Sequence, residues 1–302
     1  MKVIYRYYES DQGLEELQAQ IYNDEHERSP KSAFGKATAD QIKQRYINEK
    51  KDRLGVRYAL DEEGNPLAYI QTTFSESPPQ TWIGYPWAME HCPVEVQTFL
   101  YDEMLDYVMK KFPDNEIVMG YFTETWKRQT EFAENKGFVL KDKAFFYSVD
   151  TKKVKKASNH EFLVRNGTMD DATILIDLCK TDPNISDAFP NDEEWKSYFG
   201  DRVIPDNHVI MLFRDNLLAA AGAPLRGYYD HGILVRFTAI RPGFEDAWKI
   251  LLQEIAFHCN AQQWNEPLLF NSFTNKELAN KVAEDLGAFR RDTQVLYVLQ
   301  PE

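Results

Sequence analysis

The stretch EFAENKGFVLKDKAFFYSVD (residues 131–150) and the stretch KVAEDLGAFRRDTQVLYVLQ (residues 281–300) share one layout, half a chain apart. Each has the pattern of a helix end, a glycine and a pair of strands. Gly137 and Gly287 are 287 − 137 = 150 residues apart in a chain of 302 residues. Glycine commonly ends a helix because it adopts positive φ at little steric cost, so both are predicted C-caps. The repeat predicts that the two halves are copies of one domain.

Composition fits two globular domains. The chain is 43% hydrophobic and has no run of about 18 apolar residues, so we expect no membrane-spanning helix. Its formal net charge is −13, of which residues 1–150 contribute −8 and residues 151–302 contribute −5. Phosphate contacts need clustered Lys and Arg, so nucleic acid is not an expected partner. An acidic surface could favour cationic substrates such as amines, but an ordinary solvated surface is the preferred interpretation.

Cysteine and histidine usage argues against disulfides and metal. The three cysteines form no CxxC pair, and the six histidines show no HxxxH spacing. The first residues, MKVIYRYYESDQG, lack the apolar region of a secretory signal. We therefore expect a cytoplasmic protein without a metal site.

The coarse element order repeats as well. Each half reads β-α-α-β-β-β-α-β-α-β-β. In the first half Thr38 is a predicted helix N-cap and a long helix follows Pro93, and in the second half a hairpin turn is predicted at Asp215-Asn216. The lysine-rich stretch 151–159 is the expected linker. The predicted domains are therefore residues 1–150 and residues 160–302.

That order resembles the GCN5-related N-acetyltransferase (GNAT) superfamily, once in each half. FAENKGF (132–138) and VAEDLGAF (282–289) resemble the family's last helix end, and VRNGTMDDATILIDL (164–178) resembles its opening. The resemblance implies an α+β protein of two tandem acyl-CoA N-acyltransferase-like domains. Each would be a mixed, mostly antiparallel sheet flanked by helices.

The resemblance also implies acetyl-CoA as cosubstrate. In GNAT proteins pantetheine pairs with the fourth strand where it diverges from the fifth, and the pyrophosphate lies at the start of the next helix. The family's loop there is Arg/Gln-x-x-Gly-x-Gly/Ala. The first half has CPVEVQTFLYDEML (92–105) at this point, without glycine. The second half has IRPGFEDAWKILL (240–252), which keeps Arg241 and Gly243 but adds Glu245 and Asp246 at the helix start.

Cofactor contacts are therefore predicted in the second half. The residues carried over are Ala239, Ile240, Arg241, Gly243, Phe244 and Asn275. Asn275 follows the fifth strand, where many GNAT proteins place an Asn that reaches the cofactor or substrate. It is also a good helix N-cap, and the two roles are compatible.

Catalytic groups are harder to assign. The family's tyrosine acid, four residues before the helix-ending glycine, falls on Ala133 and Ala283. Other tyrosines could replace it only if the fold brings one to the sulfur; these are Tyr85, Tyr101 and Tyr121. Glu90, at the end of the first half's fourth strand, is the predicted base, with a solvated strand-end acid as the alternative. Asn275 is the second predicted catalytic residue.

Three functions remain open at this level. The first is transfer of an acetyl group from acetyl-CoA to the amine of a small molecule or peptide. The second is a binding or scaffold protein that has lost CoA, which the missing glycines favour. The third uses an aminoacyl-tRNA donor, which the acidic charge disfavours. In the first, the N-terminal half forms a wall of the substrate cleft or the surface of a homodimer.

Overall fold

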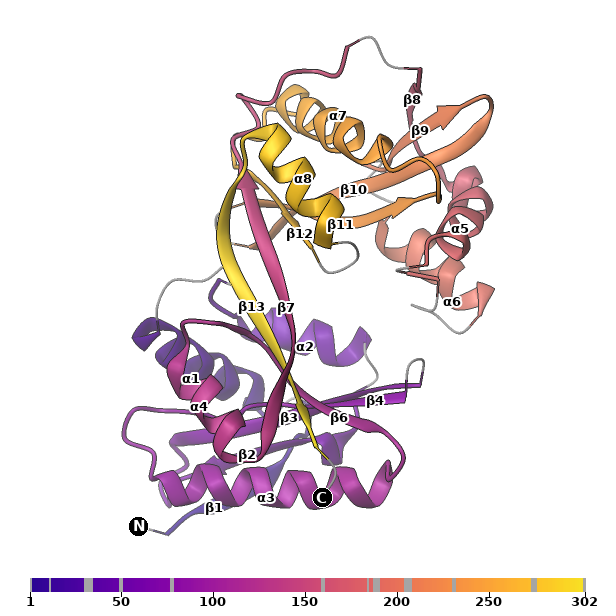
Figure 1. Cartoon of the computed structure of the whole chain (residues 1–302). Helices are drawn as coiled ribbons and strands as arrows, with labels where there is room; N and C mark the ends of the chain where they lie inside the picture. Colours follow the sequence, from indigo (N-terminus) through magenta and orange to yellow (C-terminus); the bar gives the residue numbers. More distant parts are fainter. Residues whose placement is uncertain are drawn as a thin grey trace. The chain divides into compact units, whose positions relative to one another are not determined.

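The computed structural model forms two compact units (Figure 1). They are Met1–Lys143 with Gln294–Glu302, and Ala144–Thr293. We call them the N-terminal and the C-terminal unit. The structure describes residues 2–10, 12–29, 35–48, 51–76, 79–158, 161–183, 185–186, 191–203, 208–229, 232–272 and 276–300.

The N-terminal unit has six sheet positions in the order β1-β2-β3-β4-β6-β13, with β5 also paired to β3. Its only parallel pair among the described strands is β4 with β6. Its elements are β1 (Ile4–Tyr7), α1 (Leu14–Arg28), α2 (Ala39–Asn48), η1 (Arg53–Gly55), β2 (Val56–Leu60), β3 (Pro66–Glu76), β4 (Pro79–Ile83), β5 (Trp87–Ala88), α3 (Val94–Lys111), β6 (Glu116–Thr123), α4 (Lys127–Asn135) and the start of β7 (Phe138–Val149).

The C-terminal unit repeats this plan in the order β7-β12-β11-β10-β9-β8, with β11 and β12 parallel. Its elements are β8 (Leu163–Asn166), η2 (Met169–Asp171), α5 (Ala172–Thr181), α6 (Asp192–Ser197), η3 (Tyr198–Val203), β9 (Ile210–Arg214), β10 (Leu217–Tyr229), β11 (Gly232–Ile240), α7 (Ala247–Ala261), β12 (Leu268–Asn271), α8 (Lys276–Leu286) and the start of β13 (Phe289–Leu299). These mixed sheets with flanking helices confirm the α+β prediction.

The last strand of each half is shared between the units. β7 leaves the N-terminal unit after Lys143, and its second part pairs with β12, as in Tyr147 opposite Phe270. β13 makes the reverse exchange, and its second part pairs with β6, as in Tyr297 opposite Met119. The units therefore differ from the halves 1–150 and 160–302 by one strand segment each.

One detail of the predicted order is wrong. Each half ends in a single long strand, of 12 residues in β7 and 11 residues in β13, rather than in a strand pair. The alternation of residues in these stretches is compatible with one continuous strand, because no Gly, Pro or Asn interrupts it with a turn.

Local sequence signals explain the element ends. Gly137 and Gly287 have φ of 83° and 64°, the left-handed conformation predicted for the helix-ending glycines; Gly137 lies one residue beyond Lys136, the C-cap of α4. Asp215 and Asn216 both have positive φ, of 52° and 63°, which is the geometry of a type I′ hairpin turn. Thr38 Oγ1 accepts a hydrogen bond from the Gln41 N–H at the start of α2, as an N-cap does.

The stretch that was expected to be a linker lies along α7. The Asn260 side chain donates to the Thr151 carbonyl at 2.8 Å, and the Gln253 side chain donates to the Lys155 carbonyl at 3.1 Å. Residues 144–158 therefore belong to the C-terminal unit.

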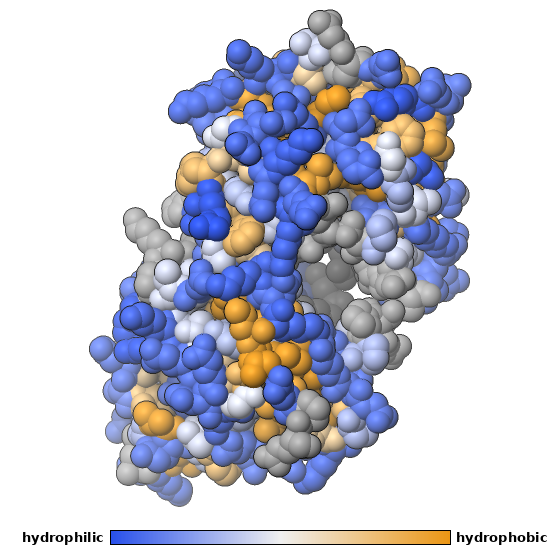
Figure 2. Space-filling view, viewed as in Figure 1, coloured by the Kyte–Doolittle hydropathy of each residue, from blue (hydrophilic) through white to orange (hydrophobic). Residues whose placement is uncertain are grey.

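The surface is mainly hydrophilic on the face shown in Figure 2, in keeping with the formal net charge of −13. Within the described residues, no helix combines the length and the apolar character that a membrane crossing requires.

Candidate functional site

Both units contain a fork where two parallel strands diverge. In the N-terminal unit, β4 pairs with β6 only from Gln80 to Trp82, and the chain then continues through β5 beside β3. In the C-terminal unit, β11 pairs with β12 only at Ile233 and Leu234, although β11 runs on to Ile240. Beyond each fork, no described strand pairs with the outer edge of the fourth strand. We use "fourth strand" for β4 with β5 and for β11.

The two outer edges are equivalent by register. Ala88 pairs with Ala68 in the N-terminal unit, and Ile240 pairs with Ala220 in the C-terminal unit. Both offsets are 152 residues, since 240 − 88 = 220 − 68 = 152. The N–H of the next residue donates to the neighbouring strand at 2.8 Å in each unit, from Met89 to the Leu67 carbonyl and from Arg241 to the Ala219 carbonyl. Because successive N–H groups of a strand point to opposite sides, those of Ala88 and Ile240 point outward.

Side chains of α1 occupy the outer edge in the N-terminal unit. The Ala88 N–H donates to Glu25 Oε2 at 2.9 Å, and Arg28 Nη2 donates to the Ala88 carbonyl at 2.8 Å. Both polar groups of this peptide position are therefore satisfied from within the unit.

The neighbouring outward positions are occupied in the same way. Gln97 Nε2 of α3 donates to the Pro86 carbonyl at 2.7 Å, and the Glu90 N–H donates to Asp24 Oδ2 at 3.2 Å. Residues 86, 88 and 90 lie on one edge because strand residues alternate in direction. The Pro86 carbonyl, both backbone groups of Ala88 and the Glu90 N–H are therefore already bonded to side chains and are not open to an extended ligand.

Glu25 is the centre of a buried polar network. Glu25 is 1% exposed, and its Oε1 accepts hydrogen bonds from the Tyr85 hydroxyl at 2.9 Å and from Gln129 Nε2 at 3.0 Å. Burial raises the pKa of Glu25, and the hydrogen bonds from Ala88 and Tyr85 oppose that rise. Three donors to one carboxylate fix α1 against the fourth strand and α4.

Aromatic rings fill the N-terminal fork. The ring of Tyr101 in α3 lies 5.3 Å from that of Phe132 in α4, and Phe132 lies 5.3 Å from Tyr85. The Tyr85 ring is 5.4 Å from Trp87, which is 5.8 Å from Trp126. These edge-to-face contacts form a packed aromatic column between α3 and α4, beside the fourth strand.

The equivalent edge of the C-terminal unit is less occupied. The Ile240 N–H donates to Asp182 Oδ2 at 2.9 Å. Asp182 is the C-cap residue of α5 and is 4% exposed. Within the described part of the chain, this is the one side-chain hydrogen bond to the outer edge of Thr238 and Ile240, and both residues are half-buried.

The loop after β11 combines a cation with an open glycine. Arg241 Nε donates to the Leu218 carbonyl at 3.0 Å, and the terminal nitrogens of Arg241 have no partner among the described residues. Gly243 has φ of 88°, with open space where a Cβ would be. Its N–H donates to Glu245 Oε1 at 3.0 Å.

The start of α7 carries a second carboxylate. Asp246 Oδ2 forms an ion pair with Arg214 Nη2 at 2.6 Å, so the negative charge of Asp246 is already compensated. The anion-binding features of this loop are thus the Arg241 side chain, the Gly243 backbone and the helix start, with Glu245 acting as an internal acceptor.

The structure brings most of the predicted cofactor residues together. Ala239 and Ile240 end β11, and Arg241, Gly243 and Phe244 form the loop that leads into α7. Glu90 is exposed in the turn before α3, in the N-terminal unit. Asn275 lies outside the described residues.

The hydroxyl groups of Tyr85 and Tyr101, at the N-terminal fork, are both enclosed within the unit. Tyr85 donates its hydroxyl to Glu25. The Tyr101 hydroxyl is buried and has no hydrogen-bond partner among the described residues. Ala133 and Ala283, at the family's tyrosine position, are both buried in the cores.

Sequence reasoning missed Glu25, Asp182 and Gln97. For Glu25 a signal existed: Leu14, Gln18, Ile21 and Glu25 form one buried stripe of α1 at helical spacing. A carboxylate on the buried face of a helix needs donors, and that requirement marks it as a site residue. Asp182 has no comparable signal, because it follows the last turn of α5.

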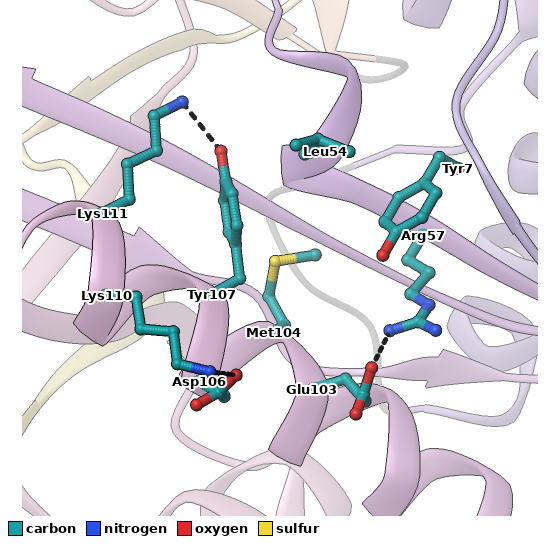
Figure 3. Close-up of a pocket in the computed structure, with 9 residues that line it drawn as sticks. All are labelled: Tyr7, Leu54, Arg57, Glu103, Met104, Asp106, Tyr107, Lys110 and Lys111. Atoms are coloured by element: carbon teal, nitrogen blue, oxygen red, sulfur yellow. Dashed lines mark hydrogen bonds and ion pairs between the residues drawn. The ribbon is translucent and has the colours of Figure 1, made fainter.

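A hollow of about 420 Å³ lies elsewhere in the N-terminal unit, between α3 and the β1–β2 side (Figure 3). Arg57 pairs with Glu103, and Lys110 pairs with Asp106, each at 2.6 Å. Lys111 bonds to Asp52. Each charged side chain that lines the hollow therefore already has a partner of opposite sign.

Two of the three thiols are poor nucleophiles. Burial raises the pKa of Cys92 to about 11 and that of Cys259 to about 12, which disfavours thiolates. Among the residues that the structure describes, no three of His, Cys, Asp and Glu are grouped to hold a metal ion.

Solved structures share the whole architecture. A GCN5-related N-acetyltransferase from Sphaerobacter thermophilus has a TM-score of 0.75 and 12% identity, covering 99% of this chain and 96% of its own. A tandem GNAT protein from the clavulanic acid biosynthesis pathway has a TM-score of 0.73 and 10% identity, covering 100% of both chains. An acetyltransferase of the GNAT family from Colwellia psychrerythraea has a TM-score of 0.62 and 11% identity, covering 99% of both.

Sequence comparison adds no further relative. No protein-family model matches the chain, and no curated protein matches it. At identities of 10–12% the structural likeness shows the fold alone.

Proposed function

Because the chain has the tandem GNAT fold, we propose that it is an N-acyltransferase which moves an acetyl group from acetyl-CoA to an amine of a small molecule or peptide. We assign the cofactor to the C-terminal unit. The observation that carries this assignment is the outer edge of β11, which among the described residues holds one side-chain hydrogen bond, whereas the N-terminal edge holds four.

The residues of the C-terminal unit fit acetyl-CoA. The outer edge of Thr238 and Ile240 provides backbone groups for the pantetheine amides. Arg241 and the open backbone of Gly243 would hold the pyrophosphate at the start of α7. Asn275 is retained as a proposed contact of the cofactor or the acceptor.

The residues of the N-terminal unit do not fit. Its outer edge is bonded to Asp24, Glu25, Arg28 and Gln97, and aromatic rings fill its fork. Its helix α3 starts after Pro93 without a glycine loop. We therefore derive no cofactor role for this unit, and the predicted base Glu90 plays no part in the proposal.

The chemistry asked of the protein is positioning and electrostatics. Acetyl-CoA supplies the activated thioester when bound. An outward N–H of β11 would orient and polarise a carbonyl group, and Arg241 would compensate phosphate charge. The acidic surface favours approach of the acceptor as an ammonium ion, which must lose a proton to solvent before it attacks. Attack of the free amine on the thioester carbonyl would form the amide and break the C–S bond, and CoA would leave as a thiolate that takes a proton from solvent.

A second candidate has its own support. Asp182 occupies the Ile240 N–H, and Glu245 occupies the Gly243 N–H, so carboxylates already take two donors that the cofactor would need. A binding protein with the same fold but without CoA would show these contacts permanently.

Calorimetric titration of the full chain with CoA and acetyl-CoA tests the proposal. We expect binding with a micromolar Kd. The affinity should fall about tenfold or more in Arg241→Ala, since charge-assisted contacts contribute about 1.5–3 kcal/mol. Arg226→Ala is the matched control, because it removes an exposed arginine of the same unit that pairs with Glu266. Absence of binding at millimolar ligand would reject the acetyl-CoA enzyme in favour of the second candidate.

A further inference from the structure

We propose that Asp182 is an internal ligand of the β11 edge, which acyl-CoA displaces from the Ile240 N–H when it binds. This inference rests on the proposed function, and it names the contact that controls access to the same site. In the free protein the N–H is bonded to Asp182 Oδ2 at 2.9 Å, with Asp182 only 4% exposed.

The backbone around Asp182 presents its carboxylate to the strand. Its N–H donates to the Leu178 and Cys179 carbonyls, both at 3.2 Å, which ends α5 at this residue. Its own carbonyl accepts from the Ile185 and Ser186 N–H groups at 3.1 and 2.9 Å. The side chain then spans from the end of α5 to the last residue of β11, a separation of 58 residues in sequence.

Two acceptors compete for this one donor. A backbone N–H makes one strong hydrogen bond, so a pantetheine carbonyl and the Asp182 carboxylate exclude each other at Ile240. The carboxylate is the stronger acceptor because it is charged. The free protein therefore holds its cofactor edge in a self-bonded state, and the affinity for CoA is reduced by the stability of that state.

The N-terminal unit provides an internal comparison. Its carboxylate on the corresponding N–H, Glu25, is one of four side chains on the edge and also accepts from Tyr85 and Gln129. Removal of Glu25 would leave Arg28, Gln97 and Asp24 in place. Only in the C-terminal unit does release of one carboxylate clear the described edge.

The test compares CoA and acetyl-CoA titrations of the full-length natural chain, Asp182→Asn and Asp182→Ala. We expect Asp182→Ala to bind CoA about tenfold more tightly, and Asp182→Asn to fall between, since a neutral amide oxygen accepts less strongly. Glu25→Gln is the control and should leave the CoA affinity unchanged. A cooperative thermal unfolding transition verifies that each variant is folded. If Asp182→Ala is not folded, the comparison of CoA affinity uses Asp182→Asn.

Each outcome decides at least one of the two proposals. Tighter binding by the Asp182 variants supports displacement. Equal binding by all folded chains overturns it and leaves the proposed function standing. Binding by the variants but not by the natural chain supports displacement and rejects the proposed function. No binding by any chain overturns both, because a vacated edge would then be no cofactor site.

Amide hydrogen exchange gives a second readout in the natural chain. If CoA replaces Asp182, the peptide that contains Ile240 changes its protection on titration, whereas the peptide that contains Ala88 does not. A change at Ala88 alone would contradict the assignment to the C-terminal unit.

Discussion

Glu25 Oε2 accepts the Ala88 N–H at 2.9 Å, and this bond closes the outer edge of the N-terminal fourth strand. The equivalent donor in the other unit, Ile240, is bonded to Asp182 at the same distance. The carboxylates themselves are not equivalent, because 25 + 152 is 177. Each unit has thus found its own acceptor for an N–H that strand pairing leaves open, as buried donors require.

Replacing Glu25 should destabilise the N-terminal unit strongly. Glu25→Ala leaves the Ala88 N–H, the Tyr85 hydroxyl and Gln129 Nε2 without their acceptor in a buried site. We expect a loss of about 3 kcal/mol in the free energy of unfolding, measured by urea denaturation. Glu27→Ala is the matched control on the same helix, since Glu27 is exposed, and it should change stability by less than about 0.5 kcal/mol. A similar loss in both variants would contradict the role of the network.

Removing the charge of Glu245 should strengthen CoA binding. The Gly243 N–H donates to Glu245 Oε1, so this carboxylate competes with phosphate for the donor and repels it. We expect Glu245→Gln to bind CoA about 3- to 10-fold more tightly, an effect of about 1 kcal/mol. Asp246→Asn is the control that removes a neighbouring negative charge without changing the bond to the Gly243 N–H, because Asp246 pairs with Arg214 instead. Equal gains in the two variants would show that only the charge matters.

Much of the fold could be predicted from local patterns. The hairpin at Asp215-Asn216, the N-cap Thr38 and the helix-ending glycines Gly137 and Gly287 each depend on a few neighbouring residues, and the structure confirms them. The exchange of β7 and β13 could not be predicted in this way. A strand sequence states which faces are buried but not which sheet accepts its edge.

The site was predictable only in part. The segment from Ala239 to Phe244 follows from its position at the end of the fourth strand and in the loop after it. The contacts that decide the state of the two forks join residues 63 and 58 positions apart, Glu25 with Ala88 and Asp182 with Ile240. Such pairings depend on how a helix end meets a strand, which no local pattern encodes.

The start of the C-terminal unit should lose stability at low pH. Arg165 donates two hydrogen bonds to Asp171, at 2.6 and 2.8 Å, and holds the pKa of Asp171 at about 2. The folded pKa lies below the unfolded value of about 3.9, so the contribution is present above about pH 4 and is lost as the pH falls towards 2.

Asp171→Asn should therefore be less stable than the natural chain by about 1–2 kcal/mol at pH 7. That difference should shrink between about pH 4 and pH 2, as followed by urea denaturation at several pH values. Asp170→Asn, at the exposed neighbouring position, is the control and should show no such convergence. A pH-independent difference would mean that Asp171 acts through shape rather than charge.

The two repeat-defining glycines should tolerate alanine poorly for backbone reasons alone. A Cβ at Gly287 would meet nothing within 4 Å, and a Cβ at Gly137 would meet only Leu299 Cδ1 at 4.0 Å. Each Ala variant should lose about 1 kcal/mol, the cost of a left-handed backbone. Asn at either position should lose less, because Asn tolerates this conformation. Gly84→Ala should cost more than either, since its Cβ would lie 2.6 Å from the Gln71 carbonyl oxygen.

The exchanged strand makes the N-terminal unit depend on the end of the chain. Val295, Leu296 and Tyr297 are at most 5% exposed, and β13 from Gln294 to Val298 pairs with β6. Burying each such side chain contributes about 1.5–3 kcal/mol, so together they match the whole stability of a typical domain. A chain that ends at Thr293 should therefore lose amide protection in β6 while β9 and β10 keep theirs. Deletion of residues 301–302 alone is the control, because it leaves β13 intact. Unchanged protection of β6 in the chain that ends at Thr293 would refute the exchange.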